Sequence, residues 1–191
     1  MSLSLSEASD AELVALALGN RQTAYRELLG RYREPVFRLI RANIGDADEA
    51  LDITQEVFVS AFAALKRYDA GRPFLAWLKR IALNKCRDWA RRRKVRSFFT
   101  RAAPLDDAYA VSDDAPPLDV QVADRRELRR TADAISALPS RLREVLVLRT
   151  VEGLSQAETA DVIGVNGKTV ETRLYRARVK LEEILDRRNE G

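Results

Sequence analysis

Basic side chains recur along one part of this sequence at a spacing that suits a polyanion. Arg80, Asn84, Arg87 and Arg91 stand at i, i+4, i+7 and i+11, so a helix would carry them on one face. Guanidinium groups bind phosphates and an amide can read base edges, which makes nucleic acid the expected ligand. Residues 79–101 hold ten basic side chains and one acidic one. A solvated helix end is the alternative interpretation.

A second cationic stretch follows a glycine-containing turn near the C-terminus. Ser155 and Glu158 fit a capping box that opens a short helix, and Gly164 to Asn166 form a tight turn into a longer one. This order is the helix-turn-helix pattern, whose second helix enters the DNA major groove. The exposed side chains at its start are Lys168, Thr169, Glu171, Thr172, Tyr175 and Arg176. Arg173 would lie near phosphates. A hairpin that serves only for packing is the alternative.

A third helical face is acidic. Asp46 and Glu49 fit a capping box at the start of a helix. Asp52, Gln55 and Glu56 then fall on the side opposite its apolar residues. Such a face is usually only solvated, and it gains meaning if a partner presents a basic helix.

Helices must position all of these side chains, because apolar residues recur at helical spacing and strand signals are nearly absent. Helices are expected over 10–18, 21–43, 46–65, 73–94, 124–138, 140–150, 156–163 and 167–185. Pro35 should kink or divide the second of them. The sequence predicts an all-α fold with two small helical domains, 1–96 and 125–191. A flexible acidic linker, 97–124, joins them, since this stretch is rich in proline and aspartate.

Composition excludes several kinds of chemistry. The 191 residues contain no His and one Cys, so a Ser-His-Asp triad, a His metal ligand, a Cys-based zinc site and an internal disulfide are excluded. No glycine-rich phosphate loop occurs, and the acidic pairs fall in the linker. We therefore expect no enzymatic activity and no cofactor or metal. The net charge of +4 conceals a basic helix and an acidic linker that nearly cancel.

The compartment follows from what the sequence lacks. No apolar run approaches the ~20 residues that a membrane span needs. The first ten residues lack the basic residue and apolar stretch of a signal peptide. We expect a cytoplasmic protein without a membrane span of its own.

Three segments, in this order, resemble the sigma-70 superfamily, in its small two-domain group, the extracytoplasmic-function (ECF) sigma factors. Residues 46–65 read DADEALDITQEVFVSAFAAL and are similar to conserved regions 2.1–2.2. Residues 74–93 read FLAWLKRIALNKCRDWARRR and are similar to regions 2.3–2.4. Residues 138–181 read LPSRLREVLVLRTVEGLSQAETADVIGVNGKTVETRLYRARVKL and are similar to region 4.

The resemblance implies a mechanism and partners. Asp52, Gln55 and Glu56 would dock on the β′ clamp helices of core RNA polymerase, and region 4 would contact the β flap. The promoter −10 element would be recognised and opened by Tyr68, Arg72, Arg80, Asn84, Arg87 and Arg91, with a flipped base held by the loop from Tyr68 to Pro73. The −35 element would be bound by Lys168, Thr169, Glu171, Thr172, Arg173, Tyr175 and Arg176, with Arg173 at a phosphate-binding position. The family further implies regulation by an anti-sigma factor.

A freestanding helix-turn-helix regulator is the alternative function. It would explain residues 138–185 equally well. It does not explain an acidic face at Asp52, Gln55 and Glu56 beside a separate basic helix. A free repressor also works as a dimer, and no segment of this sequence is typical of a two-fold interface.

Overall fold

Helices make up the regular structure of residues 5–100 and 119–189, the residues that the computed structural model describes. They follow in the order α1 (Asp10–Leu18), α2 (Gln22–Ile44), α3 (Ala47–Ala63), the 3-10 turn η1 (Leu65–Arg67), α4 (Phe74–Thr100), α5 (Asp119–Ala137), α6 (Ser140–Leu146), the π-helical turn η2 (Val147–Val151), α7 (Gln156–Ile163) and α8 (Gly167–Asn189). The predicted all-α fold class is confirmed. Of the expected linker, 97–124, residues 101–118 lie between helices and outside the described residues.

The N-terminal unit, α1–α4, closes around one apolar core. Three of its helices contribute large apolar side chains that are fully buried there: Leu13 of α1, Leu28 and Leu39 of α2, and Phe74 and Leu78 of α4. The remaining helix, α3, contributes its apolar side in the same way. At roughly 1.5–3 kcal/mol for each large apolar side chain, this burial is the main force that holds the helices together.

Pro35 lies inside α2 without dividing it. The helix runs continuously from Gln22 to Ile44, although proline removes one backbone hydrogen bond. Leu28, Val36 and Leu39 flank the proline and are fully buried. Tertiary packing on both sides therefore holds the two halves in one helix.

The start of α3 differs from the expected capping box. The Asp46 carboxylate accepts a hydrogen bond from the Glu49 backbone N–H at 3.0 Å. The Glu49 carboxylate does not complete the box but accepts from Trp89 Nε1 at 2.9 Å. This bond joins α3 to α4. The spacing of Glu49 predicts that it caps its own helix, α3, but its side chain instead helps to position α4.

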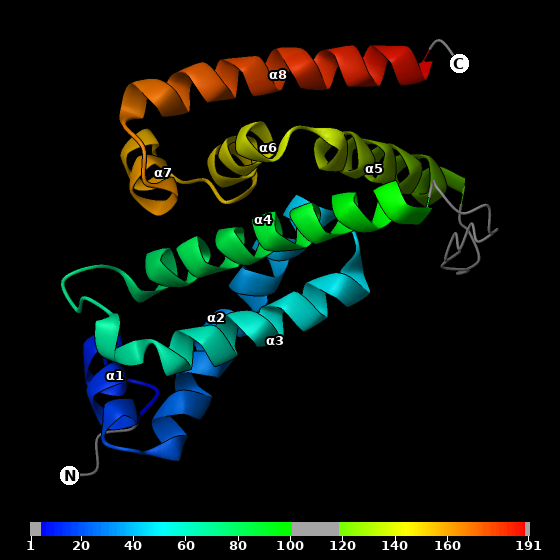
Figure 1. Ribbon diagram of the computed structural model, residues 1–191. Helices are drawn as coiled ribbons and strands as arrows, with labels where there is room; N and C mark the ends of the chain where they lie inside the picture. The colour runs from blue at the N-terminus through cyan, green and yellow to red at the C-terminus, as the bar shows by residue number, and fades with distance from the viewer. Residues whose placement is uncertain (1–4, 101–118, 190–191) are drawn as a thin grey trace.

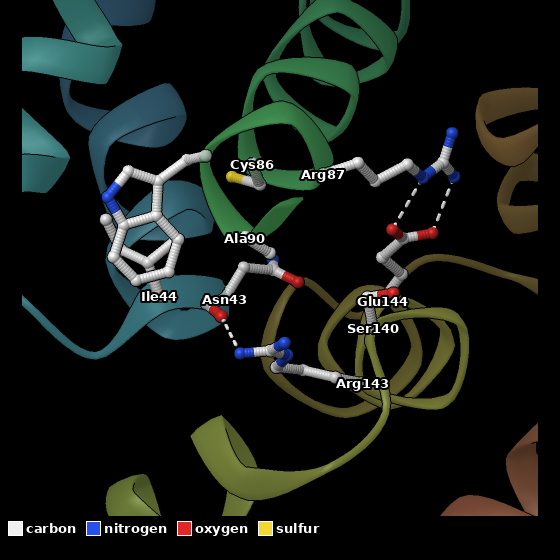
Figure 2. Close-up of a pocket in the computed structure, with 9 residues that line it drawn as sticks. Asn43, Ile44, Cys86, Arg87, Ala90, Ser140, Arg143 and Glu144 are labelled. Atoms are coloured by element: carbon white, nitrogen blue, oxygen red, sulfur yellow. Dashed lines mark hydrogen bonds and ion pairs between the residues drawn. The ribbon is translucent and has the colours of Figure 1, made fainter. Parts of the chain in front are cut away.

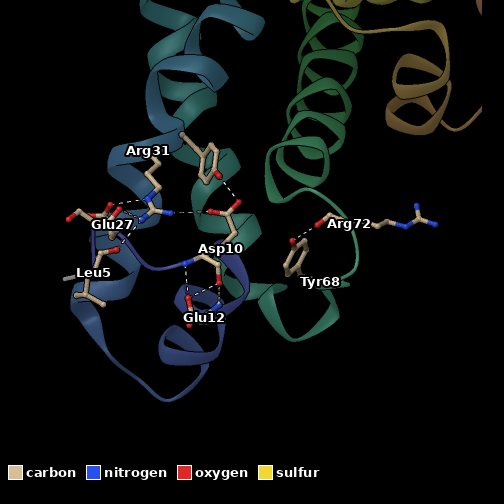
Figure 3. A network of polar contacts seen from close by, with 10 residues as sticks. Leu5, Asp10, Glu12, Glu27, Arg31, Tyr68 and Arg72 are labelled. Atoms are coloured by element: carbon tan, nitrogen blue, oxygen red, sulfur yellow. Dashed lines mark hydrogen bonds and ion pairs between the residues drawn. The ribbon is translucent and has the colours of Figure 1, made fainter. Parts of the chain in front are cut away.

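A polar network fixes α1 on α2 at the far end of the N-terminal unit (Figure 3). The Asp10 carboxylate accepts from the Tyr32 hydroxyl at 2.5 Å and from Arg31 Nη1 at 3.4 Å. Arg31 also pairs with Glu27 at 2.9 Å and donates to the Leu5 carbonyl at 3.0 Å. Burial, together with the hydrogen bond to Asp10, raises the pKa of Tyr32 above its ordinary value.

The C-terminal unit, α5–α8, contains the helix-turn-helix. Ser155 and Glu158 make both bonds of the predicted capping box at the start of α7. Gly164 ends α7 in the left-handed conformation, at φ +69°, and Asn166 Oδ1 accepts from the Thr169 backbone N–H at 2.8 Å to cap α8. The helix expected over 140–150 becomes α6 and the π-helical turn η2. Val145, Leu146, Val170 and Ala177 are buried between α6, α7 and α8.

The two units pack against each other. Val147, Leu148 and Val162 of the C-terminal unit belong to the same buried cluster as the core of α1–α4. Both α4 and α2 face the C-terminal unit: α4 packs on α6 and α7, α2 packs on α5 and α6, and α8 lies on the outside (Figure 1). Over the described residues, no helix is both long enough and apolar enough to cross a membrane.

Candidate nucleic-acid interface

The basic face predicted on α4 is present, but its members differ in exposure. Phe74, Leu78 and Ala82 are fully buried on the inner side, which turns the stripe of polar residues outward. Arg80, Asn84 and Arg91 are exposed along this stripe, whereas Arg87 is half-buried. Arg91 pairs with Asp88 one turn before it.

Arg87 is half-buried because it contacts the C-terminal unit. Its guanidinium donates to both carboxylate oxygens of Glu144 on α6, at 2.7 Å and 2.6 Å. This two-bond pairing is the geometry in which an arginine best binds a carboxylate or a phosphate, and it raises the pKa of Arg87. Arg87 Nη1 also donates to Asn84 Oδ1 at 3.0 Å. Two of the predicted −10 residues are thus joined to each other and to α6.

Lys79, on the buried side of α4 next to this face, is a charged residue that sequence reasoning missed. Its ammonium lies 2.8 Å from a carboxylate oxygen of Glu152, and both side chains are buried, with 6% and 7% exposed. Lys79 shares its side of α4 with Leu83 and Cys86, which are themselves buried. A lysine on the apolar side of a helix could have indicated a buried ion pair, because lysines are almost never buried without an oppositely charged partner.

The loop that precedes α4 is held by its own side chains (Figure 3). The Tyr68 hydroxyl donates to the Arg72 carbonyl, and Asp69 accepts from the Gly71 backbone N–H at 2.9 Å. The Tyr68 ring stands edge-on to Phe74, with centroids 5.1 Å apart, and lies against Trp77 at 5.3 Å. The loop expected to hold a flipped nucleobase is thus ordered by its own hydrogen bonds and packs on the aromatic rings of Phe74 and Trp77. The Arg72 side chain is largely exposed.

Most of the side chains expected to contact the −35 element are exposed at the start of α8. Lys168, Glu171, Thr172, Tyr175 and Arg176 are exposed, and Tyr175 reaches 70%. Thr169 and Arg173 are half-buried. Two of the predicted readers are engaged locally: the Thr169 hydroxyl donates to Asn166 Oδ1, and the Thr172 hydroxyl to the Lys168 carbonyl, at 2.8 Å and 2.9 Å. Gln156 donates to the Gly167 carbonyl at 2.8 Å and fixes α7 on α8.

The acidic face of α3 is open to solvent. Asp52, Gln55 and Glu56 are exposed, and beside them Val59 is 70% exposed. Glu56 accepts from Lys85 of α4 at 3.2 Å.

Two family models match the chain and follow its two units. "Sigma-70 region 2" matches residues 28–96, and "Sigma-70, region 4" matches residues 128–181. Together they cover more than half of the chain. The match over 28–96 places the N-terminal unit inside the family, which a freestanding helix-turn-helix regulator does not explain.

Curated relatives and solved structures agree with these matches. The chain is 41% identical over 183 residues to RNA polymerase sigma factor CnrH of Cupriavidus metallidurans, covering 94% of this chain and 96% of the relative. It is 35% identical over 187 residues to ECF RNA polymerase sigma factor SigM of Mycobacterium tuberculosis, covering 97% and 89%.

Two solved structures share the fold. The structure of CnrH in complex with the cytosolic domain of CnrY has a TM-score of 0.65 at 35% identity, covering 93% of this chain and 97% of that one. RpoE of Bartonella quintana, in complex with the anti-sigma factor NepR, has a TM-score of 0.64 at 22% identity, covering 85% and 96%, and supports the fold alone. The chain belongs to the ECF sigma factors of the sigma-70 family, with regions 2 and 4, and is a transcription initiation factor rather than an enzyme.

Proposed function

We propose that this sigma factor binds core RNA polymerase through α3, recognises and opens the −10 element through α4 and the loop before it, and reads the −35 element through α8. The observation that carries the proposal is the separation of three surfaces of different chemistry on one chain. The first is the acidic face with Asp52, Gln55 and Glu56, the second is the basic face of α4, and the third is the exposed start of α8.

Each surface suits the ligand proposed for it. An acidic helix face with an exposed valine complements a basic coiled coil such as the polymerase clamp helices. Arginines and an asparagine on α4, beside a loop backed by Tyr68, suit phosphates and an extruded base. On α8, Arg176 and Lys168 can donate to guanine, and Glu171 can accept from a cytosine amino group.

One further partner follows from the relatives rather than from the surfaces. The structure of CnrH bound to the cytosolic domain of CnrY, at 35% identity, favours a protein that binds the sigma factor itself, such as the anti-sigma factor that the family implies, as a partner of this chain. Binding of core polymerase places its action in the cytoplasm.

The test is reconstitution with core RNA polymerase and sequencing of the transcripts that start on genomic DNA. The holoenzyme should start at sites that share a −35 and a −10 element, and core polymerase alone should not. Tyr175→Ala with Arg176→Ala should abolish selection of the −35 element, with Arg187→Ala at the far end of α8 as control. Transcripts without a shared element would refute the proposal.

The polymerase surface is tested by affinity. Asp52→Lys with Glu56→Lys should weaken binding to core polymerase by about 100-fold or more, because close like charges across an interface cost several kcal/mol. Glu34→Lys, an exposed carboxylate on α2, is the control. Equal affinity of both variants would exclude α3 as the docking face.

A further inference from the structure

The loop proposed to hold a flipped base, residues 68–73, is backed by aromatic rings from two helices. The Tyr68 ring stands edge-on to Phe74 of α4. Phe74 in turn lies against Tyr32 of α2, with ring centroids 5.5 Å apart, and is itself fully buried. Because a close-packed interior transmits displacements, the place of Tyr32 determines the place of Phe74 and of the ring that supports the loop.

Tyr32 is held from α1. Its hydroxyl donates to the Asp10 carboxylate at 2.5 Å. Asp10 also accepts from Arg31 at 3.4 Å (Figure 3). Asp10 is the first residue of α1, and Leu13 of the same helix is fully buried. The carboxylate therefore belongs to an anchored helix and fixes the tyrosine from outside α2.

Asp10 also acts on Tyr68 by its charge. Burial raises the pKa of Tyr68, and the negative charges of Asp10 and Asp69 raise it further. The Tyr68 hydroxyl is thereby kept as a donor, and it donates to the Arg72 carbonyl within the loop. Asp10 is thus coupled to Tyr68 in two ways, through the packed rings and through its field.

α2 is fixed separately at its C-terminal end. There the Asn43 carbonyl accepts a hydrogen bond from Arg143 of α6 (Figure 2). Pro35 lies between this contact and Tyr32, and a proline removes a backbone hydrogen bond of the helix. The contact at Asn43 is therefore a weak constraint on Tyr32, and Asp10 provides the local one.

We propose that Asp10 is a positioning residue for promoter opening. Through Tyr32 and Phe74 it holds the loop at residues 68–73 in the shape that accepts a flipped base. The inference rests on the proposed function of that loop. Capture of an extruded base offsets the cost of unstacking it, and a loop already held in shape loses less entropy on binding than a loose one. α1, which carries none of the proposed DNA contacts, thereby contributes to opening the −10 element.

The test combines a change in the protein with a change in the DNA, in the holoenzyme and on a promoter that the wild-type holoenzyme selects. Each non-template base of the −10 element is replaced in turn by an abasic site. The rate of opening is followed by the fluorescence of a 2-aminopurine placed in the opened region outside the element. The captured base is the position at which wild type loses most, at least about ten-fold.

Asp10→Ala should make opening insensitive to the captured base. It should slow opening of the intact promoter by about five-fold or more, and the abasic site should then cost less than about two-fold further, because the capture that it removes is already lost. Tyr32→Phe keeps the ring against Phe74 and removes the hydrogen bond, so it should reduce the sensitivity in the same direction. Asp10→Asn keeps an oxygen that accepts from Tyr32 and should retain most of the sensitivity.

Glu12→Ala is the matched control within α1. The Glu12 carboxylate accepts from the Ser9 backbone N–H at 2.7 Å and completes the capping box of the same helix. Its removal therefore destabilises α1 without breaking the bond between Asp10 and Tyr32. The Glu12→Ala holoenzyme should keep the wild-type sensitivity to the abasic site.

Two outcomes would overturn the inference. Equal sensitivity to the abasic site in Asp10→Ala and wild type would mean that the two losses are independent. Equal behaviour of Glu12→Ala and Asp10→Ala would mean that the stability of α1 alone explains both. If circular dichroism shows that Asp10→Ala loses helix, Tyr32→Phe decides in its place, and unchanged sensitivity in that variant overturns the inference. Failure of the proposed function would differ, because the wild-type holoenzyme would then be sensitive at no position of the −10 element.

Discussion

Single side chains in this protein make contacts that sequence spacing does not disclose. The spacing of Glu49 predicts a cap for its own helix, and the side chain instead holds Trp89. Lys79 lies on the buried side of α4 and is paired with Glu152. In both residues the side chain is polar and its partner lies far along the chain, so local pattern cannot identify the contact. A charged group that is partly or wholly buried needs a hydrogen-bonding or oppositely charged partner, and in both cases another helix or turn provides it.

The bond from Trp89 to Glu49 should contribute measurably to stability. Trp89→Phe removes the indole donor and leaves a half-buried carboxylate without it. We expect a loss of about 2 kcal/mol in the free energy of unfolding, the usual range for a hydrogen bond to a charged group. Urea denaturation followed by circular dichroism measures it. A change below about 0.5 kcal/mol would show that water replaces the indole. Glu49→Gln, which keeps a neutral acceptor, should lose less.

Thr159 should be a position at which a substitution stabilises the protein. The residue is 0% exposed, and its hydroxyl has no hydrogen-bond partner among the described residues. Thr159→Val keeps the shape and removes the unmet polar group. We expect a gain of about 1 kcal/mol in the free energy of unfolding. Thr159→Ser keeps the hydroxyl and removes a methyl group, so it should destabilise. A decrease in stability for Thr159→Val would reveal a bound water at this hydroxyl.

At the scale of elements, helix starts and turns were the predictable part. The capping box of Ser155 and Glu158 is formed as the sequence predicts, and Gly164 takes the left-handed conformation of the expected turn. These features are predictable because their chemistry lies within a few residues. The ends of long helices were less so. α4 extends to Thr100 and α5 begins at Asp119, both beyond the limits that composition suggested.

The capping box of α7 should make stability depend on acid. Hydrogen bonds from the Ser155 hydroxyl and backbone lower the pKa of Glu158 below its ordinary value of 4.5. A lowered folded-state pKa means that this stabilisation is complete above pH 4.5 and is lost as the pH falls through the folded value. Wild type should therefore lose more stability between pH 5 and pH 3 than Glu158→Gln does. Urea denaturation across that range measures the difference. Parallel profiles would contradict the capping role.

At the scale of the whole molecule, the packing of one unit on the other is what sequence could not predict. Helical periodicity identifies the buried side of each helix but not which helix covers it. Val147 and Val162 pack into the core of the N-terminal unit. Their spacing in the sequence predicts only that they lie on the buried side of their own helices. The candidate polymerase and −35 surfaces were easier to find because they lie on the exposed sides of single helices.

The basic end of α4 should govern the salt dependence of promoter binding. Arg91→Glu, Arg92→Glu and Arg93→Glu together should weaken binding of promoter DNA by the holoenzyme. They should also reduce the slope of log affinity against log salt by about 1 for each DNA phosphate that the variant no longer neutralises. Filter binding at several salt concentrations measures the slope.

The matched control for this triple variant lies on α2. Arg26→Glu, Arg33→Glu and Arg38→Glu change the net charge equally at exposed positions. An equal slope in both triple variants would mean that overall charge, and not the end of α4, sets the salt dependence.

The apolar seam between the units also bears on how long the protein survives in the cell. Val147, Leu148 and Val162, none more than 3% exposed, pack into the core of the N-terminal unit and would meet water whenever the units part. A substitution that parts the units would therefore expose an apolar surface of the kind that chaperones and proteases recognise. Polar substitutions in this seam should shorten the lifetime of the protein in the cell even where they leave each unit's own helices intact.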